Sequence, residues 1–433
     1  MTTVPHGTLP ARAPGGAGPA APVGREELLA RLENVLHARG RALLTGPAGV
    51  GKTEVALAAA ARAEARGETV LWLAALPADR TIPGAAAAAL VASVATTVVR
   101  PGPRTEPGSL AEDPPAGPAD TPGPGALPVG VFASGVFDDL PGPQRTAVAM
   151  LCREAPIQQG GWDPIALRLG IARILRALTS RGPVLLVVDG AEFLDPDSTD
   201  LLRFALHLAP PSLRVIAVET PEPYGDTHPA DGPEPGSPGR PHPVHSAHLW
   251  VPSEADLLLV PPLHADEIAE LLIHHRLPSR MAGRIHRASG GNPRLALAVG
   301  RSLADARTPV HHAEALTLSG RARDLARQLL GAAPPPVRAT LLLAALALRP
   351  SATLVRRAGR PEAEAELAAA ERAGLVSLAE DGSLAFTAGL LPSTLVHDAC
   401  WAEVPWRSNN PEPVGTAPSS AASSSAASTP SPR

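Results

Sequence analysis

The stretch that decides the fold runs Gly46-Pro47-Ala48-Gly49-Val50-Gly51-Lys52-Thr53. It fits the pattern G-x-x-x-x-G-K-[ST], in which glycines let backbone N–H groups converge on a phosphate and the following helix adds partial positive charge. An apolar run at 41–45 precedes it and predicts a strand, and an Ala-rich run at 53–66 follows it and predicts a helix. We therefore expect a P-loop (Walker A motif) whose residues 46–53 all bind nucleotide.

Lys52 is the only lysine in the sequence, although lysine and arginine together number 38. A compact ammonium binds phosphate as a point charge, whereas arginine forms a planar fork. The alternative interpretation, a chance glycine-rich turn, does not explain why the single lysine stands here. We expect Lys52 to reach the β- and γ-phosphates and the Thr53 hydroxyl to bind Mg²⁺.

A second apolar strand is predicted at 183–189, and it ends in Asp189. Ligands of open parallel sheets bind at the carboxyl ends of the strands, so Asp189 is expected to hold Mg²⁺ together with Thr53, as a Walker B acid. Many ATPases place a second acid directly afterwards to orient the attacking water. Here Gly190 follows, so we expect slow or no turnover. Glu192 could take the catalytic role, or it could be a solvated loop charge.

The wider pattern alternates between apolar strands and helices. Apolar runs on both sides of the loop predict further strands at 69–74, 213–219 and 257–260. Strands that are apolar on both faces indicate a parallel sheet covered by helices. We expect a doubly wound α/β P-loop NTPase domain at 22–263, with Pro/Gly-rich insertions near 101–128 and 221–243.

After residue 263 the strand pattern gives way to helical periodicity. We expect a small helical lid domain at 264–320, with helices at 265–274, 279–288 and 292–304. Helices followed by the turn Glu380-Asp381-Gly382 predict a winged helix at 321–400. Composition rich in Pro, Gly, Ser and Ala predicts disordered tails at 1–21 and 410–433.

Composition limits the classes of partner and compartment. The net charge of −4 gives no electrostatic reason to expect nucleic acid as the main partner. The two cysteines, Cys152 and Cys400, are far apart and suit a reducing cytoplasm, with Cys152 expected in the core. The N-terminal residues lack the apolar segment of a secretory signal. The Ala-rich run at 82–99 predicts a packed helix rather than a membrane span.

Two weaker signals favour ordinary structural roles. His242, His245 and His248 could bind a metal, but a polar loop explains them better. Arg356, Arg357 and Arg360 form a small basic patch that we interpret as a solvated face rather than a DNA contact.

Several motifs occur in a familiar order: Val23-Gly24-Arg25-Glu26, the P-loop, Leu140-Pro141-Gly142-Pro143-Gln144-Arg145, Asp189-Gly190-Ala191-Glu192-Phe193-Leu194-Asp195 and Ser289-Gly290-Gly291-Asn292-Pro293. Together they resemble the ATPase module of the large ATP-binding LuxR-type regulators, in the STAND branch of AAA-like P-loop NTPases. The resemblance covers about residues 22–396. It implies ATP or ADP as a conformational switch, with Val23 and Arg25 near the adenine and Pro293 packing on it.

The sequence departs from the family pattern at positions expected for ATP hydrolysis and in the region where family members carry a DNA-binding domain. The family usually has an acid at Gly190, an arginine near Glu219-Thr220-Pro221, and a His-Pro after Phe386. Family members continue into helical repeats and a DNA-binding helix-turn-helix, whereas this sequence ends in a Ser/Ala/Pro-rich stretch. We therefore expect no direct DNA binding by this chain.

These features favour a nucleotide-dependent regulatory switch whose partner is another protein, such as a regulator, and which could form a nucleotide-dependent homo-oligomer. The alternative is an active ATPase that uses Glu192 as a water-activating base to drive work on a partner. A third interpretation is a degenerate scaffold, against which the intact Gly51-Lys52-Thr53 argues.

Overall fold

The computed structural model describes residues 22–99, 135–155, 162–221, 255–305 and 320–402. The three histidines at 242, 245 and 248, the predicted tails and nearly all of the two predicted insertions lie outside the described residues.

The N-terminal part is built on a parallel sheet of five strands, in the order β2-β3-β4-β1-β5. The strands are β1 (Arg41–Thr45), β2 (Thr69–Ala74), β3 (Val184–Asp189), β4 (Leu213–Glu219) and β5 (Asp256–Leu259). Their positions confirm the predicted strands to within a residue. β4 lies between the strand that leads into the P-loop and the strand that ends in Asp189, so the carboxyl ends of all three meet at one edge.

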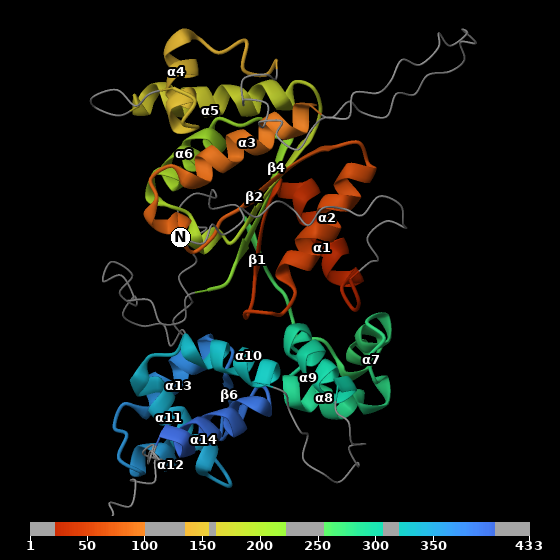
Figure 1. The fold of residues 1–433 in the computed structure, drawn as a ribbon, viewed down its shortest axis with the longest axis vertical. Helices are drawn as coiled ribbons and strands as arrows, with labels where there is room; N and C mark the ends of the chain where they lie inside the picture. The colour runs from red at the N-terminus through yellow and green to blue at the C-terminus, as the bar shows by residue number, and fades with distance from the viewer. Residues whose placement is uncertain (1–21, 100–134, 156–161, 222–254, 306–319, 403–433) are drawn as a thin grey trace, which may run out of the picture.

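Helices cover both faces of this sheet (Figure 1). On one face lie α1 (Glu26–Arg39) and α2 (Lys52–Ala65), and on the other lie α3 (Ala85–Val99), α5 (Pro164–Thr179) and α6 (Pro196–His207), with α4 (Gly142–Leu151) packed on α5. This arrangement confirms the predicted α/β fold. β1, β3 and β4 are buried on both sides because their alternate side chains enter two separate apolar clusters. The edge strand β5 instead exposes Leu257 and Leu259.

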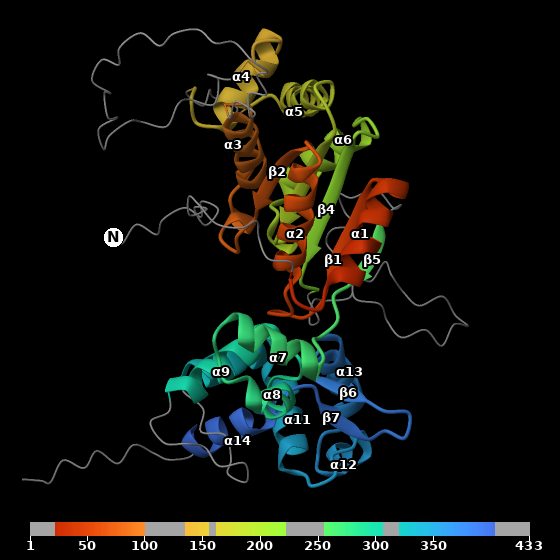
Figure 2. The ribbon, with the colours of Figure 1, turned by 90° about the vertical axis from the view of Figure 1, so that its right-hand side faces the viewer.

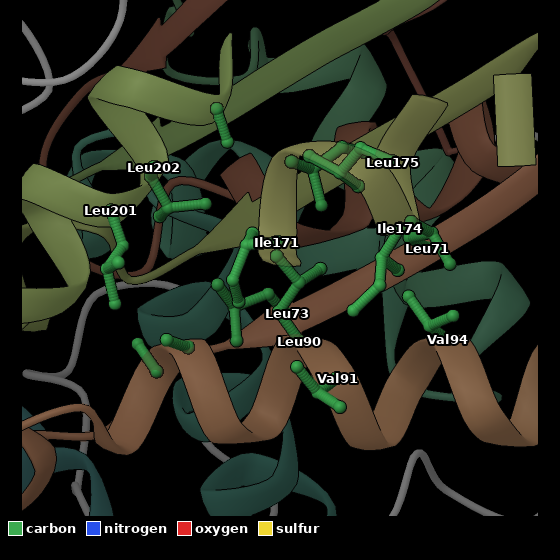
Figure 3. Close-up of a cluster of buried hydrophobic side chains, with 14 of the residues drawn as sticks. Leu71, Leu73, Leu90, Val91, Val94, Ile171, Ile174, Leu175, Leu201 and Leu202 are labelled. Atoms are coloured by element: carbon green, nitrogen blue, oxygen red, sulfur yellow. The ribbon is translucent and has the colours of Figure 1, made fainter. Parts of the chain in front are cut away.

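The apolar cluster under α3 shows how the Ala-rich run becomes a packed helix. Leu90, Val91 and Val94 of α3 belong to the same cluster as side chains of β2, α5 and α6. The labelled side chains of this cluster in Figure 3 are Leu71, Leu73, Leu90, Val91, Val94, Ile171, Ile174, Leu175, Leu201 and Leu202. None of the helices in the described part of the chain combines the length and apolarity that a membrane span needs. Cys152 packs against the same cluster, and burial raises the pKa of its thiol to about 12.

The C-terminal part consists of helices and one short hairpin (Figures 1 and 2). Its elements are α7 (Ala265–His274), α8 (Ala282–Ser289), α9 (Pro293–Asp305), α10 (Gly320–Gly331), α11 (Pro335–Leu346), α12 (Ala352–Arg357), α13 (Ala363–Arg372), the antiparallel pair β6 (Val376–Leu378) and β7 (Leu384–Phe386), and α14 (Leu390–Ala402). One continuous apolar cluster runs through all of these helices. The predicted helices at 265–274, 279–288 and 292–304 are confirmed.

Candidate nucleotide-binding site

The P-loop joins the end of β1 to the start of α2, which begins at Lys52. Gly51 caps the helix in the left-handed region with φ of 98°, a conformation that side-chain-bearing residues rarely adopt. Gly49 has φ of 82°, and a Cβ there would lie 2.9 Å from Oδ1 of Asn292. The glycines thus allow both the turn and a close approach by another part of the chain.

Lys52 is the central cation of the site. Its side chain is buried, and its Nζ donates to the carbonyl oxygens of Gly46 at 2.8 Å and Pro47 at 3.1 Å. Burial lowers the pKa of Lys52 to about 8, while the nearby carboxylates of Glu192, Asp189 and Glu219 act in the opposite direction. Because burial disfavours the charged ammonium, an anion such as phosphate that approaches Lys52 would stabilise its charge.

Thr53 and Asp189 meet beside the loop. The Thr53 hydroxyl donates to both carboxylate oxygens of Asp189, at 3.2 and 3.1 Å. Burial raises the pKa of Asp189, while the Thr53 hydrogen bond and the Lys52 charge oppose this shift. A hydroxyl and a carboxylate at this separation are the hard oxygen ligands that Mg²⁺ takes when phosphates complete its shell. The two residues therefore fit the predicted metal role.

Glu192 lies in the 3₁₀ turn Ala191–Phe193 that follows β3 and Gly190. Its side chain is only 8% exposed, so the interpretation of a solvated loop charge is wrong. Burial raises the pKa of Glu192, while backbone hydrogen bonds, one of them from Thr220, oppose the shift. Within the described residues, its Oε2 atom has no hydrogen-bond partner. An orphaned buried oxygen here is available to a water molecule or a substrate.

Asp195 fixes the turn that carries Glu192. Its carboxylate is fully buried and accepts hydrogen bonds from the backbone N–H groups of Gly84 at 2.8 Å, Ser198 at 2.9 Å and Ala86 at 3.3 Å. It therefore caps α6 and holds the start of α3 at the same time. Asp195 therefore has a structural role. Glu192 is the acid of this segment whose charge acts on Lys52.

Glu219 was not singled out as a site residue by sequence reasoning. It ends β4, stands opposite Thr45 in the strand register and is only 1% exposed. It is close enough to influence the pKa values of both Lys52 and Glu192. Its signal in the sequence is the same as that of Asp189: an apolar strand that ends in an acid.

Arg25 supports the P-loop from the N-terminal side. Its guanidinium is buried and its Nη2 donates to the carbonyl oxygen of Val50 at 3.1 Å. Burial lowers the pKa of Arg25, and the carboxylate of Glu267 in α7 opposes the shift. Val23 lies half-buried two residues earlier. The assignment of Val23 and Arg25 to adenine binding stays a prediction.

The helical part contacts the P-loop directly. Nδ2 of Asn292 donates to the carbonyl oxygen of Ala48 at 2.9 Å. The backbone N–H of Arg294 donates to the carbonyl oxygen of Gly49 at 3.4 Å. Oδ1 of Asn292 accepts from the backbone N–H of Leu295 at 3.2 Å, at the start of α9. Pro293 lies between these two contacts and is the first residue of α9, one residue after the predicted start of this helix.

A second contact comes from the turn before β6, where a Cβ on Gly374 would lie 2.9 Å from Cγ of Pro47. The three consecutive P-loop residues Pro47, Ala48 and Gly49 thus lie against elements that follow more than 200 residues later in the sequence. A pocket of about 80 Å³ lies at this junction, lined by Ala48, Asn292, Arg294, Leu295, Leu325, Gln328 and Leu329.

Residues 21–218 match the family model of the AAA ATPase domain. The matched region spans the P-loop, Asp189 and Glu192 and ends one residue before Glu219. No curated protein matches the chain.

Solved structures similar to the chain include three archaeal proteins. The Walker-type ATPase of Pyrococcus abyssi has a TM-score of 0.49 and 14% identity, covering 86% of this chain and 95% of that one. The ORC1 protein of Aeropyrum pernix, solved in complex with DNA, has a TM-score of 0.36 and 15% identity, covering 89% and 95%. A STAND protein with a tetratricopeptide repeat sensor from Pyrococcus horikoshii has a TM-score of 0.33 and 10% identity, covering 86% and 42%.

Proposed function

We propose that this protein is an ATP-binding regulatory switch of the STAND type, related to the ATPase modules of large LuxR-type regulators. The bound nucleotide would control the arrangement of the ATPase domain and the helical part, and so contact with a partner protein in cytoplasmic transcriptional regulation or signalling. The observation that carries the proposal is the direct hydrogen bond from Asn292 to the P-loop carbonyl of Ala48.

The residues of the site fit a magnesium nucleotide. The backbone of residues 46–53 and Lys52 would hold the phosphates, and Thr53 and Asp189 would hold Mg²⁺, which would neutralise phosphate charge. Val23, Arg25 and Pro293 would contact the adenine, as the family resemblance implies. Lys52 donates to carbonyls of its own loop, and a phosphate would replace these acceptors with stronger, charged ones.

The contacts between the loop and the helical part provide the coupling. Asn292 and Arg294 bind carbonyl groups of the loop, whereas a phosphate binds its N–H groups. A nucleotide that reorients these peptides changes the strength of both contacts. A nucleotide that weakens these contacts would move α9 away from the loop, and ATP and ADP would favour different arrangements.

The division of the helical part into a lid at 264–320 and a winged helix at 321–400 belongs to this proposal. The hairpin β6–β7 beside α11–α14 supports it. Within the proposed winged helix, Arg356 pairs with Glu364 at 3.0 Å and Arg360 with Glu366. These pairings neutralise much of the small basic patch and favour a protein partner over DNA. The partner could also be a second copy of this chain.

One observation favours the alternative of an active ATPase. Glu192 is buried beside Lys52, and its Oε2 atom lacks a hydrogen-bond partner among the described residues. If Glu192 activates water, Glu192→Gln should lower turnover by about 10²-fold, the usual range for a general base. In a switch that does not depend on turnover, the same substitution would leave the response to ATP and ADP unchanged.

Thermal unfolding of the full chain tests the proposal. Wild type and Lys52→Ala would be heated with ATP–Mg²⁺, with ADP–Mg²⁺ and without nucleotide. A ligand at 100 times its Kd stabilises by about 2.7 kcal/mol, which is visible as a melting shift. We expect a shift in wild type that Lys52→Ala abolishes, and different shifts with ATP and ADP. Absence of a shift in nucleotide-stripped wild type would remove the basis of the proposal.

A further inference from the structure

The two faces of the sheet separate the acids of the site. Asp189 contacts Thr53 of α2 and therefore lies on the face covered by α1 and α2. The opposite face is covered by α3, α5 and α6. Gly190 follows β3 with φ of 76°, and a Cβ there would lie 2.5 Å from the carbonyl oxygen of Ala75, so this position supplies no acid.

Glu219 places a carboxylate on that opposite face. Along β4, Val218 belongs to the apolar cluster under α1 and α2, and Ala217 to the cluster under α3 and α6. Alternation therefore puts Glu219 on the face of Ala217, at the carboxyl end of the sheet. Since β4 lies between β1 and β3, Glu219 stands between the P-loop strand and the strand of Asp189.

Two polar side-chain atoms near Glu219 are buried without a hydrogen-bond partner among the described residues. These atoms are Oγ1 of Thr45 and Oε2 of Glu192. Thr45 is opposite Glu219 in the register, and Glu192 accepts from the backbone of Thr220, the residue after Glu219. Two buried orphan oxygens beside a buried carboxylate form a suitable site for one ordered water.

The group does not have the character of a further metal site. Within the described residues, no cluster of three or more His, Cys, Asp or Glu side chains could hold a metal ion. The electrostatic influence of Glu219 instead reaches Lys52, the residue expected to bind the phosphates.

We infer that Glu219 orients the attacking water together with Glu192, and so replaces from the neighbouring strand the acid that is missing at Gly190. The inference rests on the proposed nucleotide site. In the step itself, the water oxygen forms a bond to the γ-phosphorus, and the bond from that phosphorus to the bridging oxygen of ADP breaks. The proton of the water passes to the carboxylate pair and then to solvent, so ATP and water yield ADP, phosphate and a proton.

The test is phosphate release from ATP–Mg²⁺ by the full chain, compared among wild type, Glu219→Gln, Glu192→Gln and the double variant. We expect Glu219→Gln to lower kcat by about 10- to 100-fold with KM changed less than about threefold. Two residues that act on one water form a unit. The kcat of the double variant should therefore lie within about threefold of the kcat of the slower single variant.

Glu68→Gln is the matched control. Glu68 is also a buried acid of the ATPase domain, but it pairs with Arg66 and Arg214 at the opposite end of the strands. Its replacement should leave kcat of the folded protein unchanged. If Glu219→Gln does not fold, Glu219→Asp keeps the charge and withdraws the carboxylate by one methylene, and it should lower kcat by at least about tenfold.

Unchanged turnover in Glu219→Gln or Glu219→Asp, at an unchanged melting temperature, would overturn the inference. A wild type that binds ATP but releases no phosphate would overturn it as well, while leaving the proposed switch intact. Loss of the proposed switch has a different signature, namely no nucleotide-dependent melting shift in wild type.

Discussion

At the scale of the single residue, Lys52 is the only lysine of the sequence, and its side chain is buried. Burial lowers its pKa to about 8, well below the ordinary value of a lysine side chain. At pH 8 about half of this amine is therefore unprotonated, roughly 100-fold more than for an ordinary lysine. No other lysine side chain in the sequence competes for an amine-reactive reagent.

We predict that a small acylating reagent at pH 8 modifies Lys52 and that ATP–Mg²⁺ prevents the reaction. Phosphate binding favours the ammonium form, so the pKa rises and the free amine disappears. Labelling without nucleotide should fall as the pH drops from 8 to 6, because the amine becomes protonated. Mass spectrometry of the peptide that contains Lys52 measures both effects, with the N-terminal amine as an internal control. Equal labelling with and without ATP would contradict the assignment of Lys52 to phosphate.

The contiguous pattern at 46–53 and the apolar strand ending in Asp189 could be read directly from the sequence. Glu219 could not be assigned in this way, since its closeness to Lys52 depends on β4 lying between β1 and β3. The contact of Asn292 with Ala48 joins residues 244 positions apart, and no local pattern specifies it. The sequence left Glu192 open between a catalytic acid and a solvated loop charge, because its burial comes from the packing of a turn rather than from a periodic segment.

At the scale of secondary-structure elements, Asp195 links two helices through one carboxylate. It caps α6 through Ser198 and holds the start of α3 through Gly84 and Ala86. We predict that Asp195→Ala lowers the free energy of unfolding by about 3 to 5 kcal/mol, because several buried backbone donors lose their acceptor. Chemical denaturation measures this value.

Asp163→Ala is the matched variant for that measurement. Asp163 caps α5 by accepting from the backbone N–H groups of Ile165 and Ala166, but it caps only that helix and is exposed. Its loss should lower the free energy of unfolding by only about 1 kcal/mol. Equal losses in the two variants would show that Asp195 does not join α3 to α6 in solution.

Most elements were predictable because their signals are local. The runs 41–45, 69–74 and 213–219 coincide with β1, β2 and β4, and the run 265–274 coincides with α7. The strand order was not predictable from these runs, since equally apolar strands can pair in many orders. The packing of α14 on α10 and α11 could not be predicted from a local sequence pattern either.

At the scale of the whole molecule, the P-loop is the place where distant parts of the chain meet. Gly374 has φ of 70° and contacts Pro47, whereas Gly382 has φ of 76° and nothing near the position of a Cβ. We predict that Gly382→Ala loses about 1 kcal/mol of stability from the left-handed backbone, and that Gly374→Ala loses more because its methyl group also meets Pro47. Only Gly374→Ala should accelerate nucleotide binding, because its methyl group pushes against Pro47.

Stopped-flow binding of a fluorescent ATP analogue measures this difference. Nucleotide association that is equally fast in the two variants would indicate that the turn before β6 does not restrain the P-loop. The loss of stability should also be larger in Gly374→Ala, since only there does the added methyl group meet Pro47.

The central claim is that the nucleotide controls the contact between the P-loop and α9. Hydrogen exchange tests it most directly, in the full chain with ATP–Mg²⁺, with ADP–Mg²⁺ and without nucleotide. The account predicts that a peptide covering 290–300, which includes the Arg294 amide bound to Gly49, is protected to different extents with ATP and ADP. Asn292→Asp keeps the cap on Leu295 but cannot donate to Ala48, so it should expose this peptide even without nucleotide. Identical exchange with ATP and ADP, at saturating concentrations of both, would contradict the account.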